Sequence, residues 1–246
     1  MRPALEEELL LTILTPFFLQ IPVLAALPED MQRHLERAAE QRQYRQRQVI
    51  HFPDQPGDFL YVLCTGRVKV GRTSDQGREI TLLLLEGPQI FGETGLFAPD
   101  APYDLMAETM DDSLIAVLRR SDILAALLQH PTAAMEMLKL VSERRALAET
   151  QAADLVFLDV SKRVARLLLR LHDTTSSGRG RGGLLARVKL THQELANMVG
   201  STRETTTLIL NDFKRQEAVE FIGRKIVIHN RAPLEAIAQR AEMRRK

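Results

Sequence analysis

The sequence has almost no cysteine. Cys64 is the single cysteine among 246 residues. One thiol cannot form an internal disulfide, a four-thiolate zinc site or a cysteine-ligated iron–sulfur cluster. It stands in the apolar run Phe59–Cys64, so we prefer a buried, inert thiol to a redox sensor.

Long hydrophobic runs are also missing. Runs such as Leu82–Leu85 fall far short of the roughly 18 apolar residues that span a bilayer. Residues 6–8 are glutamates, where a secretory signal would need basic residues. There is no tryptophan, but 45% of the residues are hydrophobic, which is enough to build a core. We therefore expect a folded cytoplasmic protein, independent of membranes, with one large domain or two of medium size.

The net charge of +1 conceals an uneven distribution. Residues 160–246 contain 18 Lys and Arg against 8 Asp and Glu, a charge of +10, whereas residues 1–159 carry −9. Such a division indicates different partners for the two halves, and the basic half suits a polyanion. Charge alone leaves a solvated basic face as an equal alternative.

Short runs typical of β-strands fill the region from about residue 49 to residue 118. Turn signals such as residues 53–57 and 74–77 separate them. Several short strands at spacings of about 8–12 residues are typical of a small antiparallel barrel or sandwich. The predicted strands are residues 49–52, 59–64, 67–70, 79–85 and 114–117.

Helical patterns precede and follow these strands. Residues 4–14 and 29–40 predict short helices, and Ser121 can cap another one that Pro131 ends. Residues 132–155 then contain neither Gly nor Pro, and as a helix they would extend about 36 Å. After it we predict a helix over residues 161–172 and a basic, flexible connector over residues 174–183, inside the basic half of the chain.

The long helical segment has a repeat with spacings of four and three residues. This repeat is typical of a two-stranded coiled coil with polar interruptions. A helix that packs on its own β domain would explain the same residues, but the length exceeds what a small barrel needs and favours a partner helix. The repeat consists of Met137, Val141, Arg144, Ala148, Gln151 and Leu155. We assign to the dimer interface Met137, Val141, Ala148, Leu155 and Phe157.

The strongest signal is a helix-turn-helix pattern at about residues 191–214. Thr191 and Glu194 form a capping-box pattern at a helix start, and Ser201 and Glu204 repeat it ten residues later. Gly200 stands where the tight turn needs a permissive backbone. Two helix starts so close together leave room only for a two-turn helix and a turn. Ala196 supplies the small side chain that two crossing helices need, and the shared core would come from Leu195, Val199, Ile209, Leu210 and Phe213.

The second helix of this pattern begins with polar side chains that suit DNA recognition. Arginine can bind guanine O6 and N7, and glutamate can accept from cytosine N4. Glu204 has a simpler alternative role as a helix cap. Residues 219–228 predict a hairpin, or wing, whose tip would offer cations to phosphates. The candidate DNA-binding residues are Thr191, Arg203, Glu204, Thr206, Thr207, Arg224 and Lys225.

Three motifs follow one another along the chain: Phe-Gly-Glu-Thr-Gly-Leu-Phe at residues 91–97, Phe-Leu-Asp-Val at 157–160 and Val-Gly-Ser-Thr-Arg-Glu-Thr at 199–205. With them the chain resembles, over nearly its whole length, the cyclic AMP receptor protein and fumarate–nitrate regulator (CRP/FNR) family. The resemblance implies an α+β protein with an N-terminal β jelly-roll effector domain (residues 17–131), a dimerisation helix and hinge (132–158), a C-terminal winged helix-turn-helix (159–232) and a C-terminal helix or tail (233–246). The partners that it implies are double-stranded DNA, a second copy of the chain and RNA polymerase.

The effector site departs from the family pattern. In members that bind cyclic AMP, a Gly-Glu pair followed eleven residues on by Arg-Ser forms the phosphate and ribose site. Gly92 and Glu93 match the first pair, but Pro102, Tyr103 and Asp104 stand in place of the second, and Asp104 would repel a cyclic phosphate. A small gap in this loop would change the alignment. We expect a regulator that does not use cyclic AMP in the standard way, with cyclic-AMP dependence through a non-standard phosphate site as the alternative.

The long helix supplies further candidate effector residues. Two adenine-contacting hydroxyl positions of the family fall on Ala148 and Glu149, whereas Arg144 matches a helix arginine that can pair with the Glu. His51 could hold haem, but a lone histidine is more often structural. We therefore expect no cofactor and no metal. The candidate effector-pocket residues are Gly92, Glu93, Tyr103, Asp104, Arg144 and Glu149.

The recognition helix departs from the family at one position. Arg203 and Glu204 match the family's base-reading pair, but Leu208 replaces a later arginine. One base contact is then lost or replaced by an apolar contact with a thymine methyl group. We expect a palindromic DNA site with a core that resembles the family's and is altered or relaxed at one position per half-site.

Two rival classes remain at this point. A ligand-sensing module whose helix-turn-helix no longer binds DNA would explain the same motifs, although the +10 charge argues against it. An enzyme would need paired carboxylates in a cleft, a Ser/His/Asp order, a phosphate loop or metal-ligand spacing, and we find none of these. A DNA-binding transcription regulator is the function that the sequence favours, and activation and repression stay equally open.

Overall fold

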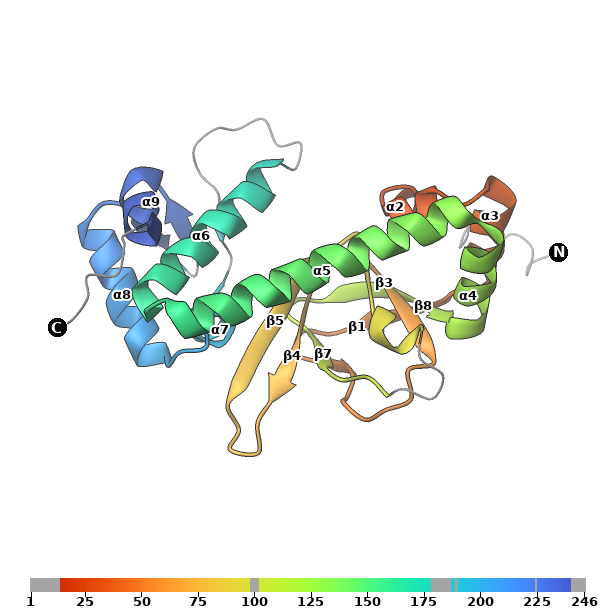
Figure 1. Cartoon of the computed structure of the whole chain (residues 1–246), viewed down its shortest axis with the longest axis horizontal. Helices are drawn as coiled ribbons and strands as arrows, with labels where there is room; N and C mark the ends of the chain where they lie inside the picture. The colour runs from red at the N-terminus through yellow and green to blue at the C-terminus, as the bar shows by residue number, and fades with distance from the viewer. Residues whose placement is uncertain (1–13, 98–101, 178–186, 189, 224, 240–246) are drawn as a thin grey trace. The chain divides into compact units, whose positions relative to one another are not determined.

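The computed structural model describes residues 14–97, 102–177, 187–188, 190–223 and 225–239. The chain divides into two compact units, residues 1–147 and 148–246, and each is described by itself. The strands β1 to β8 belong to the first unit, and helices α6 to α9 belong to the second (Figure 1). Apart from Leu14, the helix predicted over residues 4–14 lies outside the described residues.

The first unit is built on two antiparallel sheets of four strands each. One sheet has the order β1-β8-β3-β6 and the other the order β2-β7-β4-β5. This double-sheet arrangement is the predicted jelly roll. The strands are β1 (Glu40–Tyr44), β2 (Val49–His51), β3 (Phe59–Thr65), β4 (Arg67–Thr73), β5 (Glu79–Glu86), β6 (Gln89–Phe91), β7 (Met106–Thr109) and β8 (Ser113–Arg119).

Strand β3 lies at the centre of both hydrophobic clusters of this unit. Leu60, Val62 and Cys64 pack with the helices, whereas Tyr61 and Leu63 belong to a second cluster with residues of β4, β6 and β8. Because side chains alternate along a strand, one apolar run supplies both clusters. The Cys64 thiol is buried, and burial raises its pKa to about 11. The prediction of a buried thiol is thus confirmed, and its raised pKa keeps the thiol protonated and inert.

Three strands of the first unit were not predicted from the sequence. β1, with the sequence Glu-Gln-Arg-Gln-Tyr, is polar because it lies at a sheet edge beside β8, while β6 and β7 are only three and four residues long. The helix predicted over residues 29–40 is too long, since α3 (Glu29–Ala38) ends before β1 pairs Glu40 with Val117. A short α2 (Pro22–Ala25) and a 3-10 turn η1 (Glu93–Gly95) complete the region before α4.

Two helices follow the last strand. α4 (Arg120–Gln129) begins directly after β8 with Arg119 as its N-cap, so the predicted cap at Ser121 is wrong; the Ser121 hydroxyl instead donates to Asp122 at 3.0 Å. α5 (Pro131–Phe157) is the predicted long helix. It begins with a proline, which suits the first helical turn because that N–H has no partner in the helix.

The second unit is a winged helix-turn-helix. Its sheet has the order β10-β11-β9. α6 runs through Ser177, so the first four residues of the connector predicted over residues 174–183 are helical, and the rest lies outside the described residues. The elements are α6 (Val160–Ser177), β9 (Arg187–Val188), α7 (His192–Val199), α8 (Arg203–Arg215), β10 (Val219–Ile222), β11 (Lys225–Ile228) and α9 (Arg231–Gln239).

Gly200 occupies the turn between α7 and α8 in the left-handed conformation, at φ 64°. A Cβ added there would lie 2.8 Å from Cδ2 of Leu155, in the last turns of α5. Within the second unit, the end of α5 therefore packs against the helix-turn-helix turn, and only a residue without Cβ fits closely.

We expect Gly200→Ala to lower the free energy of unfolding by about 1–2 kcal/mol, because alanine adds left-handed strain and displaces Leu155. The matched control is Gly77→Ala, which has a similar φ of 74° but no atom within 4 Å of the added Cβ. Urea denaturation of the two variants checks this. A Gly200→Ala loss no larger than the Gly77→Ala loss would mean that the contact with Leu155 does not matter.

Candidate nucleic-acid interface and effector pocket

The first helix of the helix-turn-helix begins with the predicted capping box. The Thr191 hydroxyl accepts from the Glu194 backbone N–H at 3.2 Å, and the Thr191 N–H donates to the Glu194 carboxylate at 2.6 Å. The two side chains thus accept from backbone N–H groups that have no partner within the helix. This prediction is confirmed, and it fixes where α7 begins.

The second predicted capping box is wrong. α8 begins at Arg203, and its N-cap is Thr202, whose hydroxyl accepts from the Thr205 N–H at 3.2 Å. Glu204 therefore stands one position before the place where a capping-box carboxylate would bond back to the N-cap. Its side chain is exposed. Because the threonine performs the capping, the Glu204 carboxylate remains available at the helix start.

In the first turns of α8, some of the predicted DNA-binding residues are exposed and one is buried. Arg203 and Glu204 are exposed and Thr207 is half-buried. Thr206 is 0% exposed, and it cannot present its side chain to a base without a rearrangement of the unit. The physical reason is helical periodicity, because Thr206 shares the inward face with Leu210 and Phe213.

His192, the first residue of α7, was not among the candidate residues predicted from the sequence. Its Nδ1 lies 2.9 Å from the Thr207 hydroxyl of α8, and its ring lies 5.3 Å from that of Phe221 in β10. Burial lowers the pKa of His192, and the charge of Arg203 lowers it further. A neutral imidazole thus links α7, α8 and the wing. No sequence signal identifies this link, since its partners stand 15 and 29 positions away.

One apolar side chain interrupts the polar surface of α8. Leu208, which stands one turn after Glu204, is 71% exposed. It shares an exposed face with Asn211. This arrangement places the residue that replaces the family's later arginine on the outer surface of the recognition helix.

The wing is present as predicted. β10 and β11 pair from Val219 with Ile228 to Ile222 with Lys225, and Gly223 at the tip has φ 60°. Lys225 is half-buried at the start of β11. Arg224 lies outside the described residues, so the structure places one of the two predicted wing cations.

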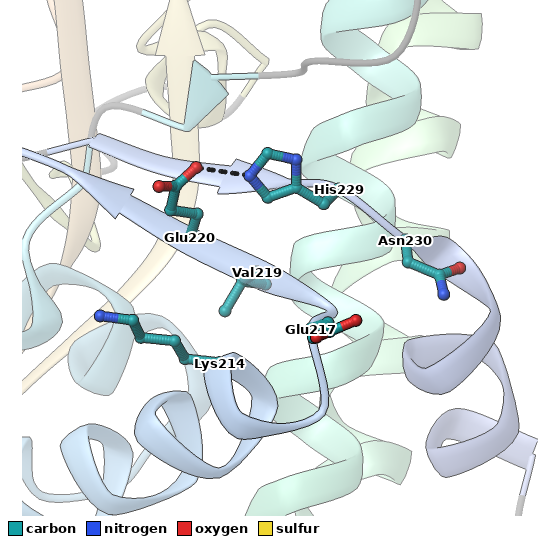
Figure 2. A pocket seen from close by; sticks show the side chains of 6 residues that line it. All are labelled: Lys214, Glu217, Val219, Glu220, His229 and Asn230. Carbon is teal, nitrogen blue, oxygen red and sulfur yellow. Dashed lines mark hydrogen bonds and ion pairs between the residues drawn. The ribbon is translucent and has the colours of Figure 1, made fainter.

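A cleft of about 430 Å³ lies between the end of α8 and the wing strands. Figure 2 shows the Glu220 carboxylate paired with His229 across the strands, with their oxygen and nitrogen 2.6 Å apart, and Lys214 on the neighbouring helix. Glu217 contributes a second carboxylate to the lining. The lining thus contains groups of both signs, and none of the predicted DNA-binding residues belongs to it.

Two of the effector-pocket candidates in the first unit, Glu93 and Arg144, form an ion pair. Arg144 of α5 pairs with the Glu93 carboxylate and donates to the Ile90 carbonyl at 2.5 Å. Gly92 precedes Glu93 with φ 84°, and a Cβ there would lie 2.9 Å from the Tyr61 ring. The chain thus holds Gly92, Glu93 and Arg144 together, and its own arginine neutralises the Glu93 carboxylate.

Tyr103 fills space inside the β-roll. Its hydroxyl donates to the Phe59 carbonyl at 2.8 Å and accepts from the Phe59 N–H at 3.2 Å. Its ring stacks on His51 with centroids 4.0 Å apart. The Cβ position of Gly92 is 3.2 Å from the same Phe59 carbonyl. Tyr103 therefore lies close to the Gly92 turn, where its side chain is packed in the interior and does not line an open pocket.

The remaining two candidates are Asp104 and Glu149. Asp104 is exposed, and its backbone carbonyl accepts from the Arg72 guanidinium at 2.9 Å. Arg72 therefore places a cation beside the loop in which the sequence has no arginine at the family's position. Because Arg72 precedes Asp104 by 32 positions, the sequence alone does not indicate this contact. Glu149 is exposed and belongs to the second unit.

His51 makes the stability of the first unit pH-dependent. Burial lowers its pKa to about 4, which the nearby backbone of Leu105 and Phe52 only partly opposes. The unfolded chain binds the proton near pH 6.5 and the folded chain does not, so stability is full above pH 6.5 and falls as the pH drops toward 4. We expect a loss of about 2 kcal/mol between pH 7 and pH 5.

The variant His51→Phe keeps an aromatic ring beside Tyr103 and should flatten this dependence. Thermal unfolding between pH 7 and pH 5 measures the difference from the unchanged chain. The control is His34→Phe, which alters an exposed histidine of α3. An unchanged slope in His51→Phe, or a flattened slope in His34→Phe, contradicts the assignment.

The predicted dimer residues differ in burial along α5. Met137 is 1% exposed and packs in the core of the first unit, and Val141 is half-buried against the same core. For Met137 the assignment to the dimer seam is therefore wrong, because this side of α5 covers its own β-roll. Ala148, Leu155 and Phe157 are exposed, as are Met135 and Leu138.

The described part of the chain offers no group of three or more His, Cys, Asp or Glu arranged for a metal ion. Among the same residues, no helix combines the length and the hydropathy that crossing a bilayer requires.

Comparisons with known proteins match both units. The model described as Crp-like helix-turn-helix domain matches residues 162–237, and the model described as cyclic nucleotide-binding domain matches residues 41–130. The CRP-like cAMP-activated global transcriptional regulator of Mycobacterium tuberculosis is 31% identical over 205 residues, which cover 80% of this chain and 89% of that protein. The global nitrogen regulator of Synechocystis sp. is 31% identical over 185 residues, covering 74% and 81%. The structure of FixK2 from Bradyrhizobium japonicum shares the fold, with a TM-score of 0.72 at 23% identity, covering 82% of this chain and 98% of FixK2.

Proposed function

Because the chain belongs to the CRP/FNR family of DNA-binding transcription regulators, with an N-terminal sensing domain and no enzymatic role, we propose that it acts as a homodimer on a palindromic DNA site. We propose further that it does not use cyclic AMP in the standard way. The observation that carries the proposal is the start of α8, where Arg203 and Glu204 are exposed and Thr202 performs the capping. Two polar side chains are thus free to read base edges.

The charge of the second half supports DNA as the partner. Residues 160–246 carry +10, which favours binding to phosphates. Thr191 caps α7, Thr207 lies in α8 and Lys225 begins β11 of the wing. They are proposed to position α8 through contacts with the DNA backbone. Arg224 is assigned the same role from sequence alone. The rival role, a ligand-sensing module without DNA binding, leaves the exposed Arg203–Glu204 pair without a purpose.

The dimer is proposed to form along the exposed side of α5. Ala148, Leu155 and Phe157 retain their assignment, and Val141 contributes its exposed part. Pairing two such helices sets two recognition helices about 34 Å apart, which is one turn of DNA. α5 ends at Phe157, and Asp159 accepts from the Lys162 N–H at 2.9 Å at the start of α6. Only Leu158 and Asp159 separate the two helices, and they form a short hinge. An effector would act by shifting the equilibrium between conformations of this hinge.

The packed interior supports a sensing domain without standard cyclic-AMP binding. Tyr103 is hydrogen-bonded inside the β-roll, and Asp104 is exposed beside it. One relative is named for activation by cAMP and another for nitrogen regulation, so membership in the family leaves the effector open. The alternative is a cyclic-AMP-dependent regulator with a non-standard phosphate site, for which Arg72, which donates to the Asp104 carbonyl, is a candidate cation.

The test is a selection of binding sites from random duplexes, followed by binding titrations of the full chain with and without cyclic AMP. We expect a palindromic consensus and an affinity that cyclic AMP leaves unchanged. Selection of unrelated, non-palindromic sequences would contradict the proposed dimer. An absence of duplex binding at low salt would contradict the proposed function. A large gain in affinity with cyclic AMP would favour the alternative. Association with RNA polymerase, the third proposed partner, is measured on the same duplex.

A further inference from the structure

The outer face of α8 carries a stripe of four exposed residues in which only one is apolar. Glu204, Leu208, Asn211 and Arg215 are spaced by four, three and four positions, and all four are exposed. Residues at these spacings share one side of a helix. The opposite side, with Thr206, Leu210 and Phe213, forms the core. Leu208 thus stands between polar neighbours on the surface that the proposed function turns toward DNA.

Packing inside the unit does not account for Leu208. Its side chain is 71% exposed, and the inward positions of the helix are already filled. A single exposed leucine is ordinary on a protein surface. Its place one turn after Glu204 is the informative feature, because the first turns of a recognition helix are those that reach base edges.

The major groove presents few apolar groups that a leucine could contact. Among the base edges, the 5-methyl group of thymine is the apolar one, whereas cytosine has a hydrogen at C5 and an N4 amino group where thymine has O4. An arginine at this position would instead bind guanine O6 and N7. Replacing the guanidinium by an isobutyl group therefore changes the preferred partner from a hydrogen-bond acceptor to a methyl group.

On this basis, and resting on the proposed function, we infer that Leu208 reads the 5-methyl group of a pyrimidine at one base pair of each half-site. Thymine and 5-methylcytosine carry that methyl group in the same place, whereas uracil and cytosine lack it. DNA binding by this protein would then respond to methylation of a cytosine at that position. The group that is recognised is the methyl itself and not the base-pairing identity.

The neighbours of Leu208 fit this role. The Thr207 hydroxyl is held by His192 at 2.9 Å, which commits part of its hydrogen-bonding capacity within the protein. Arg215 at the end of the stripe pairs with Asp212 at 2.9 Å. Beyond Glu204, polar groups of α8 are thus partly engaged, and the leucine is the side chain of this stretch best suited to an apolar contact.

The experiment uses the full chain and the duplex obtained by site selection. Each thymine of a half-site is replaced in turn by uracil, symmetrically in both half-sites, and affinity is measured by fluorescence anisotropy at fixed salt. We expect one position at which loss of the methyl weakens binding about fourfold per half-site, which is the affinity equivalent of burying one methyl-sized group. A cytosine there should bind more weakly, and 5-methylcytosine should recover the affinity that the methyl contributes.

The same duplexes are then titrated with Leu208→Ala. The variant should bind thymine and uracil duplexes equally and should not distinguish 5-methylcytosine from cytosine. Leu128→Ala, which truncates a leucine of α4 that is 83% exposed, is the matched control and should keep the methyl dependence.

The outcomes separate this inference from the proposed function. Specific binding without any methyl-dependent position, or a methyl dependence that persists in Leu208→Ala, overturns the role of Leu208 and leaves the regulator intact. Failure of the unchanged chain to bind any duplex at low salt overturns the proposed function, and the inference falls with it.

Discussion

Arg203→Ala is expected to weaken binding to the selected duplex by about 1–3 kcal/mol per half-site and to relax specificity at one base pair. Arg203 is exposed at the first position of α8, beside Glu204. Its guanidinium can form two parallel hydrogen bonds with guanine, and no alternative base offers the same pair of acceptors. Because the proposed dimer has two half-sites, the loss should be the largest that one substitution causes in DNA binding.

Titrations against the selected duplex and against single-base variants measure this effect. Arg203→Lys keeps the charge but not the forked geometry, and should lose most of the specificity. Arg33→Ala is the control, since it removes an exposed arginine of α3 in the first unit. An equal loss on every duplex, together with a smaller salt dependence, would show that Arg203 is a phosphate contact.

Arg144→Ala is expected to lower the free energy of unfolding by about 3–5 kcal/mol. The Arg144 and Glu93 side chains are only 13% and 11% exposed. Removing the arginine leaves a carboxylate buried without its partner and also deprives the Ile90 carbonyl of a donor. Desolvation of an unpaired charge is the dominant penalty, and it exceeds what the pair itself contributes.

Urea denaturation compares this variant with two others. The double variant Glu93→Gln with Arg144→Ala removes the unpaired charge and should recover part of the stability. Arg33→Ala breaks a pair with Glu29 on the surface of α3 and should change stability by less than about 1 kcal/mol. If Arg144→Ala proves no more harmful than Arg33→Ala, the pair does not stabilise the first unit.

The pattern of short strands and the long uninterrupted helix were accessible from the sequence because periodicity and turn residues act locally. The five predicted strands are present as β2, β3, β4, β5 and β8. β1 was missed because an edge strand needs no hydrophobic face, and its identity depends on the partner β8. Pairing partners far along the chain are decided by the fold.

Helix caps show the same division on a smaller scale. Thr191 and Glu194 satisfy the capping box that their spacing predicts. Ser201 and Glu204 have the same spacing, yet Thr202 is the cap. Two neighbouring hydroxyl residues can each start a helix, and the packing of Thr206, Leu210 and Phe213 selects the start that turns these side chains inward. That selection also buries Thr206 and leaves Glu204 exposed.

By itself, then, the sequence determined the order of the domains, the family motifs and the polar start of α8, since each depends on neighbouring residues. Tertiary structure alone decided that Met137 faces the β-roll, that Arg144 meets Glu93, and that His192 meets Thr207. The physical reason is that burial and pairing are properties of two surfaces brought together, whereas periodicity describes only one of them.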